Sequence, residues 1–487
     1  MTANEHVDVL IVGAGLSGIG AACHLQRRCP DRSFAIVEAR AASGGTWDLF
    51  RYPGMRSDSD MYTLSYSFRP WRKKNAIADG ASILQYLRDT ARENGIDKLI
   101  RYGQRVRRAS WSSQQSRWTV EIDRTNAAPI TLTCNFFFSC CGYYRYDTGY
   151  APAFPGMERF AGRIVHPQKW TDDIAWKGKR IVVIGSGATA MTLVPALAEG
   201  AEHVTLLQRS PTWIASRPWV DPLAHALRWL PARMAHSIVR WKQILLSIFV
   251  FQMCRRRPTR MRNLLLAGVR AWLGPDADIT TDFTPRYNPW EQRLCLVPDG
   301  DLFRAIRAGK ASMVTDQIET FTESGIALKS GKSLQADLIV SATGLELLAL
   351  GGIELLVDGR RIEPGRMISY KSMMMSGVPN LVSTFGYTNA SWTLKSDLIA
   401  EYVCRLLNFM RRGGYVQCTP TLDDAAAPTQ PWVDFSSGYL QRALALFPKQ
   451  GTRPPWTLHQ NYLRDIAQLR FGRIDDGELR FANQPAN

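Results

Sequence analysis

Apolar residues along this chain fall into two alternating patterns. Short continuous runs, typical of buried parallel strands, occur at residues 7–12, 34–37, 136–138, 180–184, 203–208, 337–344 and 381–386. Between several of these runs, apolar residues recur at helical spacing, as in helices that pack on a sheet. Strands that alternate with helices in this way form doubly wound parallel sheets. The pattern therefore predicts an α/β protein with two doubly wound domains.

Two glycine-rich loops each follow an apolar run and lead into a predicted helix. The first contains Gly13, Gly15 and Gly18, and the second contains Gly185, Gly187 and Ala190. In a strand–turn–helix unit, such glycines allow a tight turn and let a pyrophosphate lie against the amide groups at the helix start. Two such loops predict two Rossmann-like domains that bind two dinucleotides.

The residues that end the next run distinguish the two cofactors. Glu38 follows the first loop, where a carboxylate can accept hydrogen bonds from ribose hydroxyls and repels a 2'-phosphate. Arg209 and Ser210 follow the second loop, where a cation and a hydroxyl suit the 2'-phosphate of NADPH. We predict FAD or NAD at the first loop and NADPH at the second. The alternative is that these charges are solvated loop residues.

The order of these features predicts domains that are not continuous in sequence. Residues 1–152 form the first part of one nucleotide-binding domain, and residues 153–221 form the first part of the other. A basic helical insertion occupies residues 222–289. Residues 290–372 complete the second domain, and residues 373–487 complete the first domain with a C-terminal segment.

Composition narrows the class of protein. The hydrophobic content of 45% and the charged content of 21% are those of an ordinary globular protein. The nine cysteines show neither a C-x-x-C pair nor metal-ligand spacing. Because the first apolar run begins at Val7, we expect no secretory leader. We expect reduced thiols, no metal site and a cytoplasmic location. The missing cysteine pair also argues against a two-dinucleotide disulfide reductase.

The formal net charge of +17 calls for an anionic partner, yet no nucleic-acid-binding module is visible, so we expect no nucleic acid. The positive charge is concentrated at residues 222–275, which contain no acidic residue. The cations there are Arg228, Arg233, Arg240, Lys242, Arg255, Arg256, Arg257, Arg260, Arg262 and Arg270.

The same segment carries an apolar stripe at helical spacing, typical of a helix that lies in a membrane interface. The stripe consists of Met234, Ile238, Trp241, Leu245 and Ile248, with basic residues on both flanks. The run at residues 244–254 would give roughly 16 Å of helix, too short for a hydrocarbon core of about 30 Å. Two interpretations stay open: an insertion packed on its own domain with a solvated basic face, and peripheral contact with an anionic membrane, on the inner face of the cell membrane.

Two longer patterns lie between the glycine loops. Phe160, Gly162, His166 and Trp170 match F-x-G-x-x-x-H-x-x-x-W. Residues 44–58, which include Gly45, Trp47 and Asp58, match [AG]-G-x-W-x-x-x-x-[FY]-P-[GM]-x-x-x-D at every fixed position. Together they resemble the patterns of type I Baeyer-Villiger flavin monooxygenases. The segments at 44–61, 288–295 and 386–395 look most like the branch that contains the ethionamide-activating monooxygenase of mycobacteria. One departure is Thr171, where the family pattern ends in Pro or Asp.

This resemblance implies an enzyme that binds FAD and NADPH. With O2 it would insert oxygen next to a ketone carbonyl through a C4a-peroxyflavin, giving an ester or lactone, and it would also oxidise the sulfur of thioethers or thioamides. The resemblance further implies that Arg293 stabilises negative charge during oxygen transfer and that Asp58 orients it. His166 would organise the linker between the domains rather than carry a proton.

Two other functions remain compatible with these patterns. One is a flavin-containing monooxygenase of nitrogen and sulfur without ketone activity, and the other is a membrane-surface NADPH flavoprotein. The physiological substrate, a small ketone or organosulfur compound, and the oligomeric state do not follow from the sequence.

Overall fold

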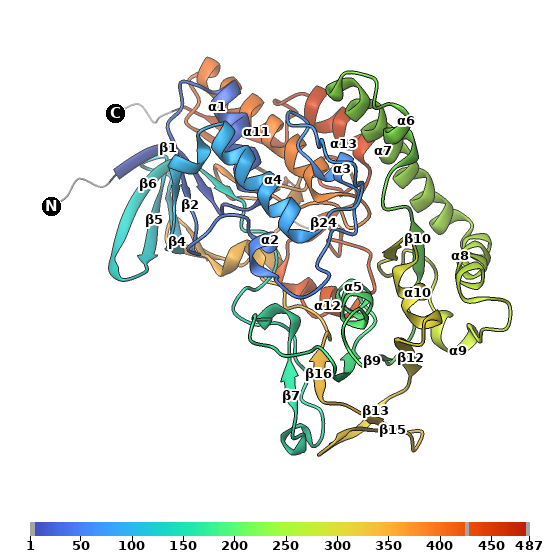
Figure 1. Ribbon diagram of the computed structural model, residues 1–487. Helices are drawn as coiled ribbons and strands as arrows, with labels where there is room; N and C mark the ends of the chain where they lie inside the picture. The colour runs from blue at the N-terminus through green and yellow to red at the C-terminus, as the bar shows by residue number, and fades with distance from the viewer. Residues whose placement is uncertain (1–4, 424–427, 484–487) are drawn as a thin grey trace.

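A nine-stranded mixed sheet forms the first unit of the computed structural model, which describes residues 5–423 and 428–483 (Figure 1). β5 runs antiparallel to β4 and β6, whereas β1 is parallel to β2 and β6. The strand order is β18 (Arg360–Ile362), β17 (Glu354–Val357), β4 (Gln104–Ser112), β5 (Arg117–Arg124), β6 (Ala127–Ser139), β1 (Glu5–Val12), β2 (Phe34–Val37) and β3 (Ile100–Arg101), and β21 (Leu381–Ser383) also pairs with β6.

Helices α1 (Leu16–Arg28), α4 (Gly80–Glu93) and α11 (Trp392–Gly413) cover one face of this sheet. Val9 and Ile11 of β1 pack into the same core as these helices. Leu10 and Val12 point the other way, into the core that contains Trp111 and Trp118 of the antiparallel strands. Because β1 is buried on both faces, its sequence is a continuous apolar run rather than an alternating one.

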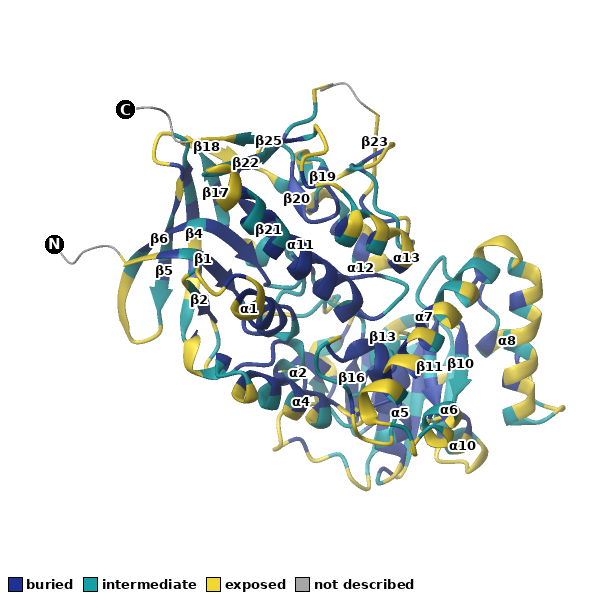
Figure 2. Cartoon of the chain, turned by 90° about the horizontal axis from the view of Figure 1, so that it is seen from above, coloured by how far each residue is buried: buried dark blue, intermediate teal, exposed yellow. Residues whose placement is uncertain are grey.

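A five-stranded parallel sheet forms the second unit. Its order is β12 (Ala311–Thr315), β9 (His203–Gln208), β8 (Arg180–Ile184), β16 (Leu338–Ser341) and β7 (Arg163–Val165). Helices α5 (Ala188–Ala198) and α10 (Asp301–Arg307) pack on one face, and the antiparallel strands β13 (Ile318–Thr322), β14 (Gly325–Leu328) and β15 (Ser333–Gln335) pack on the other. Figure 2 shows the buried residues concentrated in the strands of both sheets and the helices against them. The predicted fold class, with two Rossmann-like units and a discontinuous first domain, is confirmed.

The return of the chain to the first sheet comes earlier than we predicted. β17 pairs with β4, and β18 pairs with β17, so the chain is already part of the first sheet at Glu354. The second domain therefore does not extend to residue 372. β17 and β18 form a short hairpin at a sheet edge, where burial is incomplete, so they lack the continuous apolar run by which the other strands are recognised.

Helices α6 (Pro222–Ala226), α7 (Ala232–Arg256), α8 (Pro258–Leu273) and α9 (Thr280–Phe283) occupy the segment of the predicted insertion and lie along one side of the molecule (Figure 1). α7 is continuous over 25 residues, so our estimate of an apolar helix too short to span was wrong. By length and composition it is the one helix in the described part of the chain that could cross a membrane, with 28% of its most apolar stretch buried. The estimate failed because it counted only residues 244–254 and stopped at Lys242 and Gln243, although the helix continues through them.

Shorter elements connect the two units or pack beside them. They are α2 (Thr46–Leu49), α3 (Met61–Leu64), β10 (Ile214–Arg217), β11 (Cys295–Pro298), β19 (Ser369–Tyr370), β20 (Met374–Met375), β22 (Gln417–Pro420), β23 (Thr429–Gln430), α12 (Gly438–Gln441), β24 (Gln450–Gly451), α13 (Tyr462–Asp465) and β25 (Leu479–Ala482). β10 pairs in parallel with β11 and so joins the two ends of the helical insertion. All nine cysteines are free thiols, and most are buried.

Candidate active site

A cavity of about 1130 Å³ lies between the two units. Its walls come from both glycine loops, the loop after α2, the segment after β6, the loop before β11 and α12. The predicted site residues that line it are Gly13, Gly15, Glu38, Gly45, Trp47, Asp58, Gly185, Gly187, Arg209, Ser210 and Arg293. The structure thus brings both nucleotide loops and both candidate catalytic residues to one site.

The first glycine loop is shaped for the close approach of a cofactor. Gly13 has a φ of +104°, and a Cβ there would lie 2.7 Å from the carbonyl oxygen of Cys140. A Cβ at Gly18 would lie 1.8 Å from the carbonyl oxygen of Gly13, so only glycine allows α1 to pack this closely on the loop. Gly15 precedes α1 without a capping side chain, which leaves the first amide groups of the helix for an anion. The loop fits the pyrophosphate of FAD.

Glu38 is held in a fixed position at the end of β2. Its Oε2 accepts a hydrogen bond from the amide of Ala14 at 2.8 Å, and its Oε1 accepts one from the amide of Arg40 at 2.9 Å. Burial raises the pKa of Glu38, although both hydrogen bonds oppose this effect. Each carboxylate oxygen keeps a lone pair with which it can accept a hydrogen bond from a ribose hydroxyl.

The second glycine loop repeats this construction between β8 and α5. Gly185 has a φ of +134°, and a Cβ there would lie 2.3 Å from the carbonyl oxygen of Ala342. A Cβ at Gly187 would meet no atom within 4 Å, which leaves this side of the loop open to a ligand. Ala190, at the third position of the pattern, is fully buried in α5.

Arg209 and Ser210 lie directly after β9, on the wall of the same cavity. Both side chains are exposed, so they can turn toward a bound nucleotide. Among the described residues, Arg209 forms no ion pair with an acid. A guanidinium and a hydroxyl at the end of this strand fit a 2'-phosphate.

The segment around α2 packs on the first glycine loop. The amide of Gly44 donates to the carbonyl oxygen of Ala14 at 3.0 Å, and a Cβ at Gly45 would lie 3.1 Å from the Cα of Gly15. Trp47 follows directly, on the cavity wall and against the core of the first unit. The segment from Gly45 to Asp58 thus connects the FAD loop with the acid that contacts Arg293.

Arg293 and Asp58 form an ion pair on the cavity wall, with 2.7 Å between Nη2 of Arg293 and Oδ2 of Asp58. Asp58 belongs to the first unit, whereas Arg293 precedes β11 beside the second. Hydrogen bonds at Glu291 hold the loop that carries Arg293. Asn288 donates to the carboxylate of Glu291, and the carbonyl oxygen of Glu291 accepts from Ser436 at 2.9 Å. The sequence predicted this pair by resemblance, and the structure brings its two members into contact.

The surroundings of Arg293 keep it charged. Burial lowers the pKa of a guanidinium, but the carboxylate of Asp58 and nearby tyrosine hydroxyls raise it more, so the pKa lies above the ordinary arginine value. Arg293 remains partly accessible, at 33% of its side-chain surface. It can therefore face a ligand in the cavity while Asp58 holds its other side.

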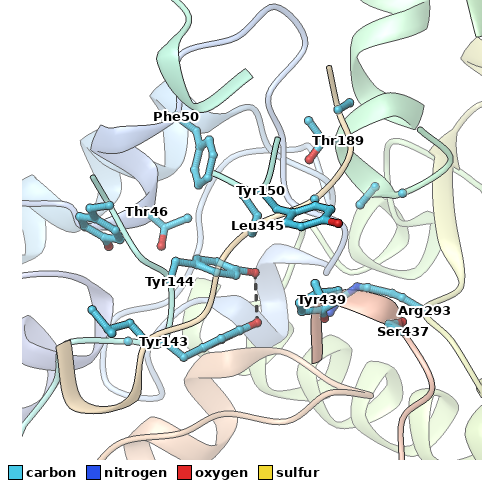
Figure 3. A pocket seen from close by; sticks show the side chains of 18 of the residues that line it. Thr46, Phe50, Tyr143, Tyr144, Tyr150, Thr189, Arg293, Leu345, Ser437 and Tyr439 are labelled. Carbon is cyan, nitrogen blue, oxygen red and sulfur yellow. Dashed lines mark hydrogen bonds between the residues drawn. The ribbon is translucent and has the colours of Figure 1, made fainter. Parts of the chain in front are cut away.

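Three tyrosines that the sequence analysis did not single out surround Arg293. The hydroxyls of Tyr143 and Tyr144 lie 3.0 Å apart, and Figure 3 shows them pointing toward the part of the pocket where Arg293 and Tyr439 lie. Tyr143 also stacks on Trp392 at 5.2 Å between ring centroids. A signal existed for the first two, since they follow the small-residue turn at the end of β6. Tyr439 lies far along the chain in a segment without a recognisable pattern.

Burial sets the protonation state of these tyrosines. Burial raises the pKa of Tyr143, Tyr144 and Tyr439 above the ordinary value, although the charge of Arg293 lowers it in each case. The hydroxyls are therefore neutral at physiological pH and can donate hydrogen bonds. Together with Arg293 they line the cavity with hydrogen-bond donors that can stabilise negative charge or bind a carbonyl oxygen.

His166 ties the linker to two segments that cross between the units. Its Nε2 donates to the carbonyl oxygen of Gly344 at 3.1 Å, and its Nδ1 accepts from the amide of Gln168 at 3.2 Å. Gln168 in turn donates to the carbonyl oxygens of Arg145 and Tyr146. Burial lowers the pKa of His166, so the ring is neutral at physiological pH. His166 is outside the cavity lining, and this position agrees with an organising role.

The other residues of the linker pattern are structural. Phe160 is buried against the second sheet, and a Cβ at Gly162 would lie 2.6 Å from the Phe160 ring. Trp170 is buried on the other face of that sheet. Thr171, the departure from the family pattern, is exposed, and its hydroxyl helps to lower the pKa of Asp173. The pattern thus builds the edge of the second unit rather than the cavity wall.

Comparison with known families shows that residues 62–373 match the flavin-binding monooxygenase-like family. The chain belongs to this family. Residues 11–74 also match an NAD(P)-binding Rossmann-like domain, which covers the first glycine loop and Glu38. The predicted resemblance to flavin monooxygenases is confirmed.

Full-length relatives support this assignment. The chain is 54% identical over 484 residues to the FAD-containing monooxygenase EthA of Mycobacterium tuberculosis, covering 99% of each chain. It is 47% identical over 480 residues to the probable FAD-binding monooxygenase AlmA of an Acinetobacter species, covering 98% of this chain and 96% of the other. Among solved structures, a steroid monooxygenase bound to NADP superposes with a TM-score of 0.77 at 22% identity, covering 98% of this chain and 100% of that one. The cofactor predictions, FAD and NADPH, are confirmed at the level of the family.

Proposed function

We propose that this flavin monooxygenase uses NADPH and O2 to convert ketones to esters or lactones and to oxidise the sulfur of thioethers or thioamides. The observation that carries the proposal is the ion pair of Arg293 and Asp58 on a cavity shared by two dinucleotide loops. In the balanced reaction, ketone, O2, NADPH and a proton give ester, water and NADP+. Bound FAD supplies the oxygen chemistry.

Arg293 supplies positive charge where the ketone must react. When a nucleophilic oxygen adds to a carbonyl carbon, negative charge builds on the carbonyl oxygen. A guanidinium with a raised pKa stays protonated and can donate to that oxygen. Because Asp58 already holds one side of Arg293, little reorganisation is needed as the charge develops.

The tyrosines add shape and donors to the same wall. Tyr143 and Tyr144 place two neutral hydroxyls beside Arg293, and Trp392 stacks behind Tyr143. Aromatic rings bury an apolar substrate and keep water away from the reacting atoms. This surface suits a small apolar ketone or thioether whose one polar group points at Arg293.

NADPH fits the second loop through its phosphates. The pyrophosphate would lie at the start of α5, where Gly187 leaves the amide groups open, and the 2'-phosphate would meet Arg209 and Ser210. The neutral His166 holds the linker at Gly344 while the nicotinamide occupies the shared cavity. The linker therefore controls where the second unit places its cofactor.

Oxidation of sulfur alone, without ketone activity, is the alternative. Transfer of oxygen to sulfur builds no negative charge on a carbonyl oxygen, so it has less need of Arg293. The purified holoenzyme is given NADPH, O2 and either a cyclic ketone or a thioether, and products are compared with NADPH consumed. Ester or lactone formed in step with NADPH supports the proposal, whereas sulfoxide formation with no ester from any ketone supports the alternative.

A further inference from the structure

Helix α7 leaves an apolar face open to solvent and buries a mixed polar and apolar face against the protein. Its buried residues are the polar His236, Arg240 and Gln243 and the apolar Val239, Ile244 and Cys254. The outward face, which we define as Met234, Ile238, Trp241, Leu245 and Phe249, is between 41% and 61% exposed. In a surface helix of a soluble protein an apolar stripe normally lies against the core. The exposed apolar side chains of the outward face therefore indicate a binding surface.

Polar contacts fix α7 to the first unit in this orientation. Nη1 of Arg240 donates to the carbonyl oxygens of Tyr62 and Ser65 at 2.8 and 2.9 Å. Nε2 of His236 lies 2.9 Å from the hydroxyl of Ser65. Because these buried groups would lose their partners if the helix turned over, the outward face cannot be hidden by a simple rotation.

Two further large apolar residues of the helical insertion are exposed. Trp229, just before α7, is 76% exposed, and Leu264 of α8 is 62% exposed. Figure 2 shows that exposed residues follow α8 along most of its length at the edge of the molecule. An exposed surface of this kind on a monomer marks a site of protein or membrane contact.

The charge around the outward face favours a membrane over a protein as the partner. Residues 222–275 contain no aspartate or glutamate. Arg256 continues the spacing of the outward face by one more step of seven residues from Phe249, and Arg257 and Arg260 follow at the junction with α8. None of these three has an acidic partner among the described residues, and all are exposed. An apolar stripe that ends in unpaired cations matches the surface of an anionic bilayer.

We propose that the outward face of α7, with Trp229, Leu264 and the arginines at the α7–α8 junction, docks this enzyme on the surface of an anionic lipid bilayer. The helix lies along the surface and does not cross it, although it is long and apolar enough to do so. The reason is that Arg240 and His236 keep its other side bound to the first unit. A trans-bilayer position would expose both side chains to hydrocarbon.

Binding of the purified, FAD-loaded full chain to sedimented vesicles tests the proposal without turnover, so its outcome is independent of the proposed reaction. Vesicles of phosphatidylcholine alone are compared with vesicles that also contain phosphatidylglycerol. We expect binding to the anionic vesicles only, and release as salt is raised. Neutralising Arg256, Arg257 and Arg260 to Gln should weaken binding by roughly five-fold per cation, or roughly a hundred-fold in total.

Two matched controls separate a local surface from general charge or hydrophobicity. Arg360, Arg361 and Arg412 are also exposed but lie on the first unit, and their triple Gln variant should bind as the unaltered protein does. Trp241→Ser with Phe249→Ser should abolish binding, while Leu99→Ser with Tyr102→Ser, at exposed positions near β3, should not.

Three results would overturn the proposal. The first is no binding to anionic vesicles at low salt, and the second is equal binding by the Arg256/Arg257/Arg260 variant and its control. The third concerns a second copy of the chain as the partner. If the Trp241/Phe249 variant converts an oligomer to monomers in sedimentation velocity while vesicle binding is absent throughout, the outward face is an interface between copies.

Discussion

Oδ2 of Asp58 lies 2.7 Å from Nη2 of Arg293, and this contact joins a loop of the first unit to the loop before β11. Asp58 follows the segment that packs on the FAD loop, whereas Arg293 is anchored through Glu291 to Ser436 in the C-terminal segment. One ion pair therefore links the position of the flavin loop to the position of the cation. Variants of either residue test this relationship.

Arg293→Ala should separate NADPH consumption from product formation. Loss of one donor to a developing oxyanion costs about 10²- to 10³-fold in rate, so ester formation should fall by that factor while flavin reduction continues. Reduced oxygen should then leave as hydrogen peroxide. Stopped-flow reduction, peroxide assay and product analysis measure the three steps. Arg286→Ala, at an exposed arginine of the same segment, is the control; an Arg293→Ala enzyme with full coupling would remove Arg293 from the reaction.

Asp58→Asn should also lower the amount of ester formed per NADPH consumed, but by less than Arg293→Ala does. The cation remains, yet the amide holds it less firmly, so we expect roughly a ten-fold loss of ester per NADPH consumed. Ketone oxidation should suffer more than thioether oxidation, because only the ketone builds negative charge beside Arg293. Equal losses of product with the ketone and the thioether would mean that Asp58 stabilises the fold of its loop and does not orient Arg293.

Arg209→Ala should weaken NADPH binding and leave NADH binding unchanged. A charge-assisted hydrogen bond to the 2'-phosphate contributes about 1.5 kcal/mol at an exposed site, which is roughly ten-fold in affinity. Titration of the oxidised enzyme with NADP+ and NAD+ provides the measurement, and NAD+ is the internal control. A parallel loss for both nucleotides would show that Arg209 does not contact the phosphate.

His166→Ala should loosen the linker, whereas His166→Gln should retain part of its function. The neutral ring donates to Gly344 from Nε2, and a glutamine amide can donate in the same direction. We expect the alanine variant to consume NADPH with lower product yield and the glutamine variant to fall between it and the unaltered enzyme. Rescue by glutamine is the decisive comparison, since a base in proton transfer could not be replaced by an amide.

His236 should make the protein less stable in mild acid. Burial lowers the pKa of His236 from 6.5 to about 4, with a further contribution from Arg240. Between these two pKa values the unfolded chain binds a proton at His236 that the folded chain does not bind. The contribution of neutral His236 to the free energy of unfolding is therefore fully present above pH 6.5 and is lost as the pH falls toward 4. The loss amounts to about 3 kcal/mol across this window.

His236→Gln removes the titration while keeping a group that can bond to Ser65. Its melting temperature should fall less between pH 7 and pH 5 than that of the unaltered protein, which differential scanning calorimetry can measure. His225→Gln, at an exposed histidine of α6, is the matched control and should leave the pH profile unchanged. Identical profiles for all three proteins would assign the acid sensitivity to other groups.

The nucleotide sites could be predicted from the sequence because their geometry is local. A glycine at φ +104° or +134° that cannot carry a Cβ, an apolar strand before it and a helix after it all lie within one short segment. Glu38 and Arg209 follow at the ends of the next strands, so the parallel sheet alone places them beside their loops. Strand and helix spacing suffice to specify such a unit.

Contacts between distant segments could not be predicted in this way. Tyr439 reaches Arg293 only because the C-terminal segment returns to the cavity, and β17 joins β4 as an edge hairpin with no continuous apolar run. The direction of α7 is the clearest case. Its sequence determined an amphipathic basic helix. Which face meets the protein depends on the carbonyl oxygens of Tyr62 and Ser65, because they accept hydrogen bonds from the buried guanidinium of Arg240. Periodicity specifies which residues share a face, whereas only tertiary packing decides what that face meets.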